Sequence, residues 1–153
     1  MSIQSKVLLD EYEARLTLFS AIEPGHTGWS QEIQRVGAVM VLQGLLGGQY
    51  NSQSCSKLLQ KIEQTNFEML QTAIAVSGSE FIYPGHALWP QQVDQLANPP
   101  IGLIVKGDLL QLSQKSIAIV GTREPSAYGQ EMAADFATAF VNQGWNVVSG
   151  GAL

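Results

Sequence analysis

The sequence has little of several features, and each shortage excludes a class of protein. Cys55 is the only cysteine among 153 residues, so no disulfide can form within the chain, and a reducing compartment fits. Only 14% of the residues are charged, and 13 acidic residues outnumber 8 basic ones, so the chain as a whole is not steered towards nucleic acid. No apolar run approaches the roughly 18 residues of a membrane span. The acidic N-terminal segment around Asp10 and Glu13 is unlike a signal peptide, so we expect a cytoplasmic protein with no membrane partner.

The first 76 residues have the features of a small helical domain. Hydrophobic residues make up 45% of the chain, enough for a core. Apolar residues at helical spacing and turn-forming loops predict four short helices. The first carries an apolar stripe of Leu9, Tyr12, Leu16 and Phe19. The second is predicted to start at a Ser30 cap, with Ile33, Val36, Gly37 and Met40 on its inner face; the others span about Ser56–Glu63 and Phe67–Ala75, the last capped by Asn66.

Residues 77–115 change character, because proline and glycine become frequent and charges become few. This composition predicts an extended connector with one helical turn near Gln91–Leu96. It is followed by an edge strand that ends at Gly107.

Residues 116–153 show the pattern of a parallel βαβ unit. Ile117–Val120 is an apolar run of β-branched type, Gln130–Asn142 has helical periodicity, and Trp145–Val148 is the next strand. A strand, a helix and a strand in this order form a right-handed crossover. The predicted fold class is therefore α/β, with a small helical domain at 1–76, a connector at 77–115 and the start of a Rossmann-like domain at 116–153.

Small and polar residues follow both predicted strands of this unit. Gly121, Thr122 and Arg123 come after the first strand, and Ser149, Gly150 and Gly151 come after the second. Ligands of open parallel sheets bind beyond the carboxyl ends of the strands. Glycine lets the backbone approach a ligand, a following helix offers free N–H groups, and a guanidinium forks onto phosphate. These six residues are candidates for a phosphate cradle, without proton-transfer groups.

A plainer interpretation of the first loop stays open. Pro125 and Ser126 would then only start a helix, and Arg123 would pair with Glu124 or Glu131 on the surface. The other motifs carry little chemistry. G-x-G-x-x-G, the Walker sequence and G-x-S-x-G are absent, and no cysteine or carboxylate is spaced to complete a metal site with His26 and His86. We expect no cofactor and no metal, a packing role for Trp29, Trp89 and Trp145, and a partly buried Cys55.

Three segments together resemble the DNA-processing protein A family. They read "YPGHALWPQQVDQLANPPIGLIVKGD", "SIAIVGTREPSAYG" and "GWNVVSGGA", in the family's order and spacing, and the resemblance covers about Phe81–Leu153. The family's G-[ST]-R segment matches Gly121–Arg123, and its S-G-x-A segment matches Ser149–Ala152. The helical N-terminus is more loosely similar to the family's SAM-like domain.

The resemblance implies a bacterial cytoplasmic protein of natural transformation that binds single-stranded DNA. Such proteins protect incoming strands, help to load a RecA-type recombinase, have an extended Rossmann fold, act as homodimers and need no catalytic residues. The family's motif continues into G-I-D, whereas this sequence ends at Leu153, so we expect a truncated chain whose βαβ part exposes apolar surface. From Ser116 onward Arg123 is the only Lys or Arg, so residues outside this sequence would have to complete a basic groove.

Two other functions stay open. The layout of strand, glycine, helix, strand and paired glycines also resembles lysine-decarboxylase-like phosphoribohydrolases, which release the base from nucleoside monophosphates. Alternatively, the helical N-terminus is a module that docks onto a partner.

Overall fold

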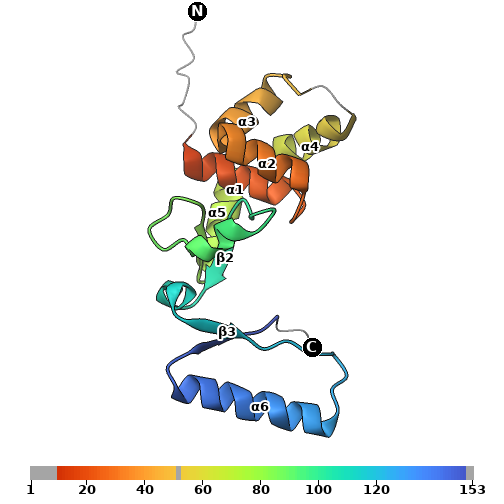
Figure 1. Cartoon of the computed structure of the whole chain (residues 1–153). Helices are drawn as coiled ribbons and strands as arrows, with labels where there is room; N and C mark the ends of the chain where they lie inside the picture. The colour runs from red at the N-terminus through yellow and green to blue at the C-terminus, as the bar shows by residue number, and fades with distance from the viewer. Residues whose placement is uncertain (1–9, 51–52, 151–153) are drawn as a thin grey trace, which may run out of the picture. The chain divides into compact units, whose positions relative to one another are not determined.

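The structure is a computed structural model and describes residues 10–50 and 53–150. It divides into two compact units, Met1–Gly107 and Asp108–Leu153 (Figure 1). The predicted class is confirmed, because a helical part is followed by a parallel βαβ arrangement. The domain boundaries at residues 76 and 115 stay a prediction; in space, the connector up to Gly107 groups with the helices.

Among the described residues, the first unit contains five α-helices. These helices contribute most of one apolar core. They are α1 (Glu11–Ala21), α2 (Thr27–Val36), α3 (Ala38–Leu46), α4 (Gln53–Gln64) and α5 (Phe67–Val76). The Asn66 side chain accepts a hydrogen bond from the Met69 amide at 3.0 Å, so the predicted cap of α5 is confirmed. The core includes Ala14, Leu18, Ile33, Val41, Leu42, Leu58 and Ile62. Of the predicted stripe on α1, Leu16 is buried, Tyr12 and Phe19 are half-buried, and Leu9 lies outside the described residues.

The prediction of a single second helix was wrong. The chain forms two helices there, α2 and α3, because Gly37 has φ +88° and ψ 153°, a conformation that only glycine adopts easily. The first of them also starts earlier than predicted, since the His26 side chain rather than Ser30 caps it and accepts from the Trp29 amide at 3.3 Å. The break rotates the next residues, so Met40 is 58% exposed instead of facing the core.

The connector forms a small antiparallel sheet that sequence analysis found only in part. Strand β2 (Leu103–Lys106) was predicted, but its partner β1 (Ser79–Ile82) was not. The register pairs Ser79 with Lys106 and Ile82 with Leu103. Between the two strands, the one-turn helix η1 (Gln91–Gln95) confirms the predicted helical turn.

The second unit is a two-stranded parallel sheet with one helix beside it (Figure 1). After η2 (Leu109–Ser113) come β3 (Ser116–Ala118), α6 (Ala127–Asn142) and β4 (Asn146–Val148). Gly144, with φ +77°, ends the helix and turns the chain into β4. None of the residues 108–150 is buried, and Val120, Phe136 and Val148 are exposed. The expected exposure of apolar surface in this unit is therefore confirmed.

Candidate nucleic-acid interface

The parallel pairing of β3 and β4 brings the two predicted loops to one edge of the sheet. Ser116, Ile117 and Ala118 pair with Asn146, Val147 and Val148. The Ile119 amide also donates to the Val148 carbonyl at 2.9 Å, which continues the ladder beyond the strands. Because the strands run in the same direction, both end on the side where α6 begins (Figure 1). Residues 121–123 and 149–150 thus follow neighbouring strand ends at one edge.

The loop after β3 is fixed by its own short hydrogen bonds. Thr122 Oγ1 accepts from the Glu124 amide at 3.2 Å, and Ser126 Oγ accepts from the Gly129 amide at 3.1 Å, which caps α6. The amides of Ala127 and Tyr128 lie in the first helical turn, where no intrahelical acceptor exists. The helix end therefore offers N–H groups and the positive end of its dipole on the side of this loop.

Arg123 is exposed and is the cation available at this edge. Among the residues that the structure describes, it makes no ion pair and no hydrogen bond. The alternative pairing with Glu124 or Glu131 is thus not seen there. By contrast, Lys115 is engaged, since its Nζ lies 3.6 Å from the centroid of the Trp145 ring. An exposed guanidinium without a protein partner is able to take an external oxyanion.

The glycines of the two loops have no packing reason within the described residues. A Cβ built on Gly121 or on Gly150 meets nothing within 4 Å, and neither residue has a positive φ. Both positions leave backbone accessible from outside. Ser149 is likewise exposed, whereas Gly151 lies outside the described residues.

The charge around this edge is not positive. The second unit carries Lys115 and Arg123 against Asp108, Glu124, Glu131 and Asp135. Hydrogen bonds from the Gln111 side chain and the Leu110 amide lower the pKa of Asp108, so this carboxylate is well stabilised as an anion. At the loops, the features among the described residues that attract an anion are the Arg123 guanidinium, the start of α6 and the backbone amides.

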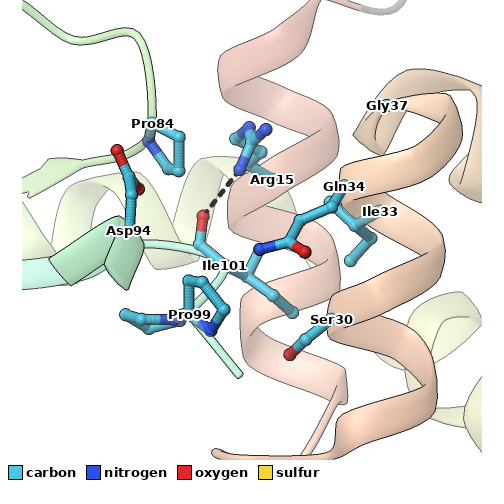
Figure 2. A pocket seen from close by; sticks show the side chains of 10 residues that line it. Arg15, Ser30, Ile33, Gln34, Gly37, Pro84, Asp94, Pro99 and Ile101 are labelled. Atoms are coloured by element: carbon cyan, nitrogen blue, oxygen red, sulfur yellow. Dashed lines mark hydrogen bonds between the residues drawn. The ribbon is translucent and has the colours of Figure 1, made fainter. Parts of the chain in front are cut away.

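Sequence analysis did not single out two residues that the structure makes prominent. Tyr128 is an aromatic residue in the first turn of α6 and is 70% exposed. Its signal was an aromatic residue at the start of a helix that follows a glycine loop. Arg15 is buried, donates from Nη1 to the Ile101 carbonyl, and lines a cavity of about 370 Å³ with Ile33, Gln34 and Asp94 (Figure 2). Nothing in the local sequence indicated that partner.

The remaining candidates have structural roles. Trp89 is buried, and its Nε1 donates to Asp94 Oδ1 at 2.9 Å, so its predicted packing role is confirmed. Cys55 is half-buried against the core, as expected. Within residues 10–50 and 53–150 no group of three or more His, Cys, Asp or Glu side chains is placed to hold a metal ion. The same residues include no helix long and apolar enough to cross a bilayer.

The second unit has the βαβ arrangement of open parallel sheets, which bind ligands beyond the carboxyl ends of their strands. Sequence comparison gives a more specific likeness. Residues 80–153 match the family described as DNA recombination-mediator protein A. Over 63 residues the chain is 38% identical to the DNA processing protein DprA of Bacillus subtilis (strain 168). The resemblance to the DNA-processing protein A family is therefore confirmed over residues 80–153.

The match has a limited extent. It covers 40% of this chain and 21% of the Bacillus subtilis protein, so the chain spans about a fifth of that relative. No solved structure matches the chain significantly. The family description refers to DNA recombination, and the name of the Bacillus subtilis protein refers to DNA processing.

Proposed function

We propose that this chain supplies part of a single-stranded DNA-binding protein that acts in DNA uptake and natural transformation. The observation that carries the proposal is the exposed, unpaired Arg123 beside the open amides at the start of α6, on a segment that matches the family. A guanidinium and helix amides suit one phosphate of a strand, and Tyr128 offers a surface for base stacking. Gly121, Thr122, Ser149, Gly150 and Gly151 would complete the contact.

The partners follow from the same proposal. The protein would protect incoming strands in the cytoplasm, help to load a RecA-type recombinase, and act as a homodimer without cofactor, metal or catalytic residue. The exposed apolar residues of the second unit support a further protein surface there, because Val120 is 83% exposed and Phe136 and Val148 are also exposed.

The test is fluorescence anisotropy of a labelled oligothymidine with the full-length protein at several salt concentrations. We expect Arg123→Ala to weaken binding about ten- to a hundredfold, because charge-assisted hydrogen bonds contribute about 1.5–3 kcal/mol. The salt slope should also fall by about 0.7, the value for one phosphate contact on a single strand. Lys106→Ala is the matched control, since it removes one positive charge from an exposed side chain outside the loops.

Two outcomes would contradict the proposal. Oligothymidine binding that does not differ between Arg123→Ala and Lys106→Ala would remove Arg123 from the interface. Release of free base from a nucleoside monophosphate, together with no oligonucleotide binding, would favour the phosphoribohydrolase instead.

A further inference from the structure

A second cavity, of about 310 Å³, lies in the first unit between α1, α5 and β1. Tyr12 from α1, Phe81 from β1, and Tyr83 and His86 after β1 contribute rings to its wall, and Glu80 contributes a carboxylate. Phe81 and Tyr83 are two residues apart in extended chain, so their side chains fall on the same side. The residues of the proposed DNA contact do not line this cavity.

The rings form one connected cluster rather than isolated contacts. The centroids of Tyr12 and Phe81 are 5.7 Å apart at an interplanar angle of 79°, and those of Tyr12 and Tyr83 are 6.2 Å apart at 66°. His86 adds a fourth ring, 6.3 Å from Tyr83. Phe81 is buried and anchors the cluster to the sheet. Each ring contact restricts the others, so the wall is preorganised.

The wall of the cavity includes one carboxylate, that of Glu80, and the imidazole of His86. Glu80 is a carboxylate on the rim, 54% exposed, and its Oε1 lies 3.6 Å from His86 Nε2. No Lys or Arg is among the described residues that line the cavity. Burial raises the pKa of Tyr12 most, and the nearby negative charges of Glu80 and Asp10 raise it further. An incoming cation would therefore meet the Glu80 carboxylate and the aromatic rings of the wall.

The cluster already holds one cation of the chain itself. The Arg15 guanidinium carbon lies 5.6 Å from the centroid of the Tyr83 ring. This contact places a guanidinium of the chain itself within cation–π distance of the Tyr83 ring.

We propose that the cavity binds an alkylammonium or guanidinium cation, and specifically the Lys or Arg side chain of a partner polypeptide. The volume accommodates a long basic side chain but is small for a folded element. The single rim carboxylate neutralises one positive charge, while the rings of the wall pack against the alkyl stem and the head. The site lies in the first unit and does not depend on the proposed DNA contact at Arg123.

The test is a titration of the ¹⁵N-labelled chain, followed by two-dimensional NMR, with N-acetyl-lysine methylamide and with N-acetyl-arginine methylamide. The neutral N-acetyl-norleucine methylamide has a similar stem without the charge, and tetramethylammonium chloride represents a free cation without a peptide. We expect shifts at the amides of residues 79–86 and of Tyr12, at millimolar concentration, with both basic probes and not with norleucine. Tighter binding of tetramethylammonium than of either peptide probe would overturn the assignment to a side chain.

Variants separate the charge from the rings. Glu80→Gln should weaken binding of the basic probes about three- to tenfold, whereas Glu68→Gln, a carboxylate on α5 that does not line the cavity, should leave it unchanged. Tyr83→Phe keeps the ring and should bind as the parent does, and Tyr83→Leu should bind more weakly, with the NMR spectrum reporting that the fold is retained. Shifts that are equal for lysine and norleucine, or absent up to tens of millimolar, would overturn the proposal.

Discussion

Arg15 Nη1 donates a hydrogen bond of 3.0 Å to the carbonyl oxygen of Ile101, a residue far along the chain (Figure 2). The same guanidinium pairs through Nε with Glu11 and lies over the Tyr83 ring. Helix α1, the end of β1 and the approach to β2 thus share one buried side chain. The first unit therefore includes the connector as part of its packing.

Arg15→Leu should destabilise the first unit by about 2–3 kcal/mol, because the variant loses a charge-assisted hydrogen bond and leaves the Ile101 carbonyl without a partner. Urea denaturation followed by tryptophan fluorescence measures this change. Arg35→Leu is the control, since Arg35 pairs with Glu32 at an exposed position and should matter far less. Equal losses for the two variants would contradict the structural role of Arg15.

Gly102→Ala should cost about 1–3 kcal/mol of stability, the usual cost of overpacking. A Cβ at this position would overlap two ring atoms of Phe81 and would lie 2.9 Å from the Ile82 carbonyl oxygen. The ring is buried and the carbonyl is backbone, so neither moves away easily. The same denaturation experiment tests it, and Gly28→Ala in α2 is the control. That substitution makes only ordinary contacts, at 3.5 Å or more, and should be neutral or stabilising.

Ser126→Ala should destabilise the start of α6 by about 1 kcal/mol, because the Gly129 amide loses its acceptor. Faster hydrogen exchange at Gly129 would report this loss. Thr138→Ala, inside the same helix, removes a bond from Oγ1 to the Ala134 carbonyl and should leave exchange at Gly129 unchanged. If Gly129 exchanges at the same rate in Ser126→Ala as in the parent, the cap is not formed in solution.

Acidification should loosen η2 at pH values below the ordinary carboxyl pKa of 3.8, and not above it. The pKa of Asp108 is lowered by the Gln111 side chain and the Leu110 amide, so the folded state holds the carboxylate more strongly than the unfolded chain does. The resulting stabilisation is complete above the unfolded pKa and is lost as the pH falls through the folded value.

NMR resonances of the Gln111 and Asn146 side-chain amides should follow this titration. Asn146 Nδ2 donates to Gln111 Oε1 at 3.0 Å, so protonation of Asp108 reaches β4 through Gln111. In Asp108→Asn the step should vanish. If the chemical-shift titration of these amides keeps the same midpoint pH in Asp108→Asn, the titrating group is not Asp108.

Local signals accounted for the parts of the fold that the sequence predicted well. Asn66 lies directly before an apolar helix, and Gly144 lies directly after one, so both helix ends were found. The parallel βαβ order and the position of Arg123 at a strand end also followed from neighbouring residues.

Distant partners explain what the sequence did not predict. Strand β1 is short, and it is a strand only because Ser79–Ile82 pairs with Leu103–Lys106. Arg15 is buried because its acceptor is Ile101. The break at Gly37 was missed for a different reason: glycine was assigned to a helix face from its spacing, although its backbone freedom determines the local conformation.

The register of β1 and β2 also determines where this chain tolerates changes in length. Ile82 opposes Leu103, so residues 83–102 form a loop whose two ends are held together, and Arg15 holds its last part. Extra residues near the exposed Ala97 would lengthen that loop at a cost of well under about 1 kcal/mol, because closure entropy grows slowly with length. One extra residue inside β2 would instead exchange the two faces of the strand. Homologous chains should therefore vary in length between Pro90 and Pro99 and keep a constant spacing from Gly102 to Gly107.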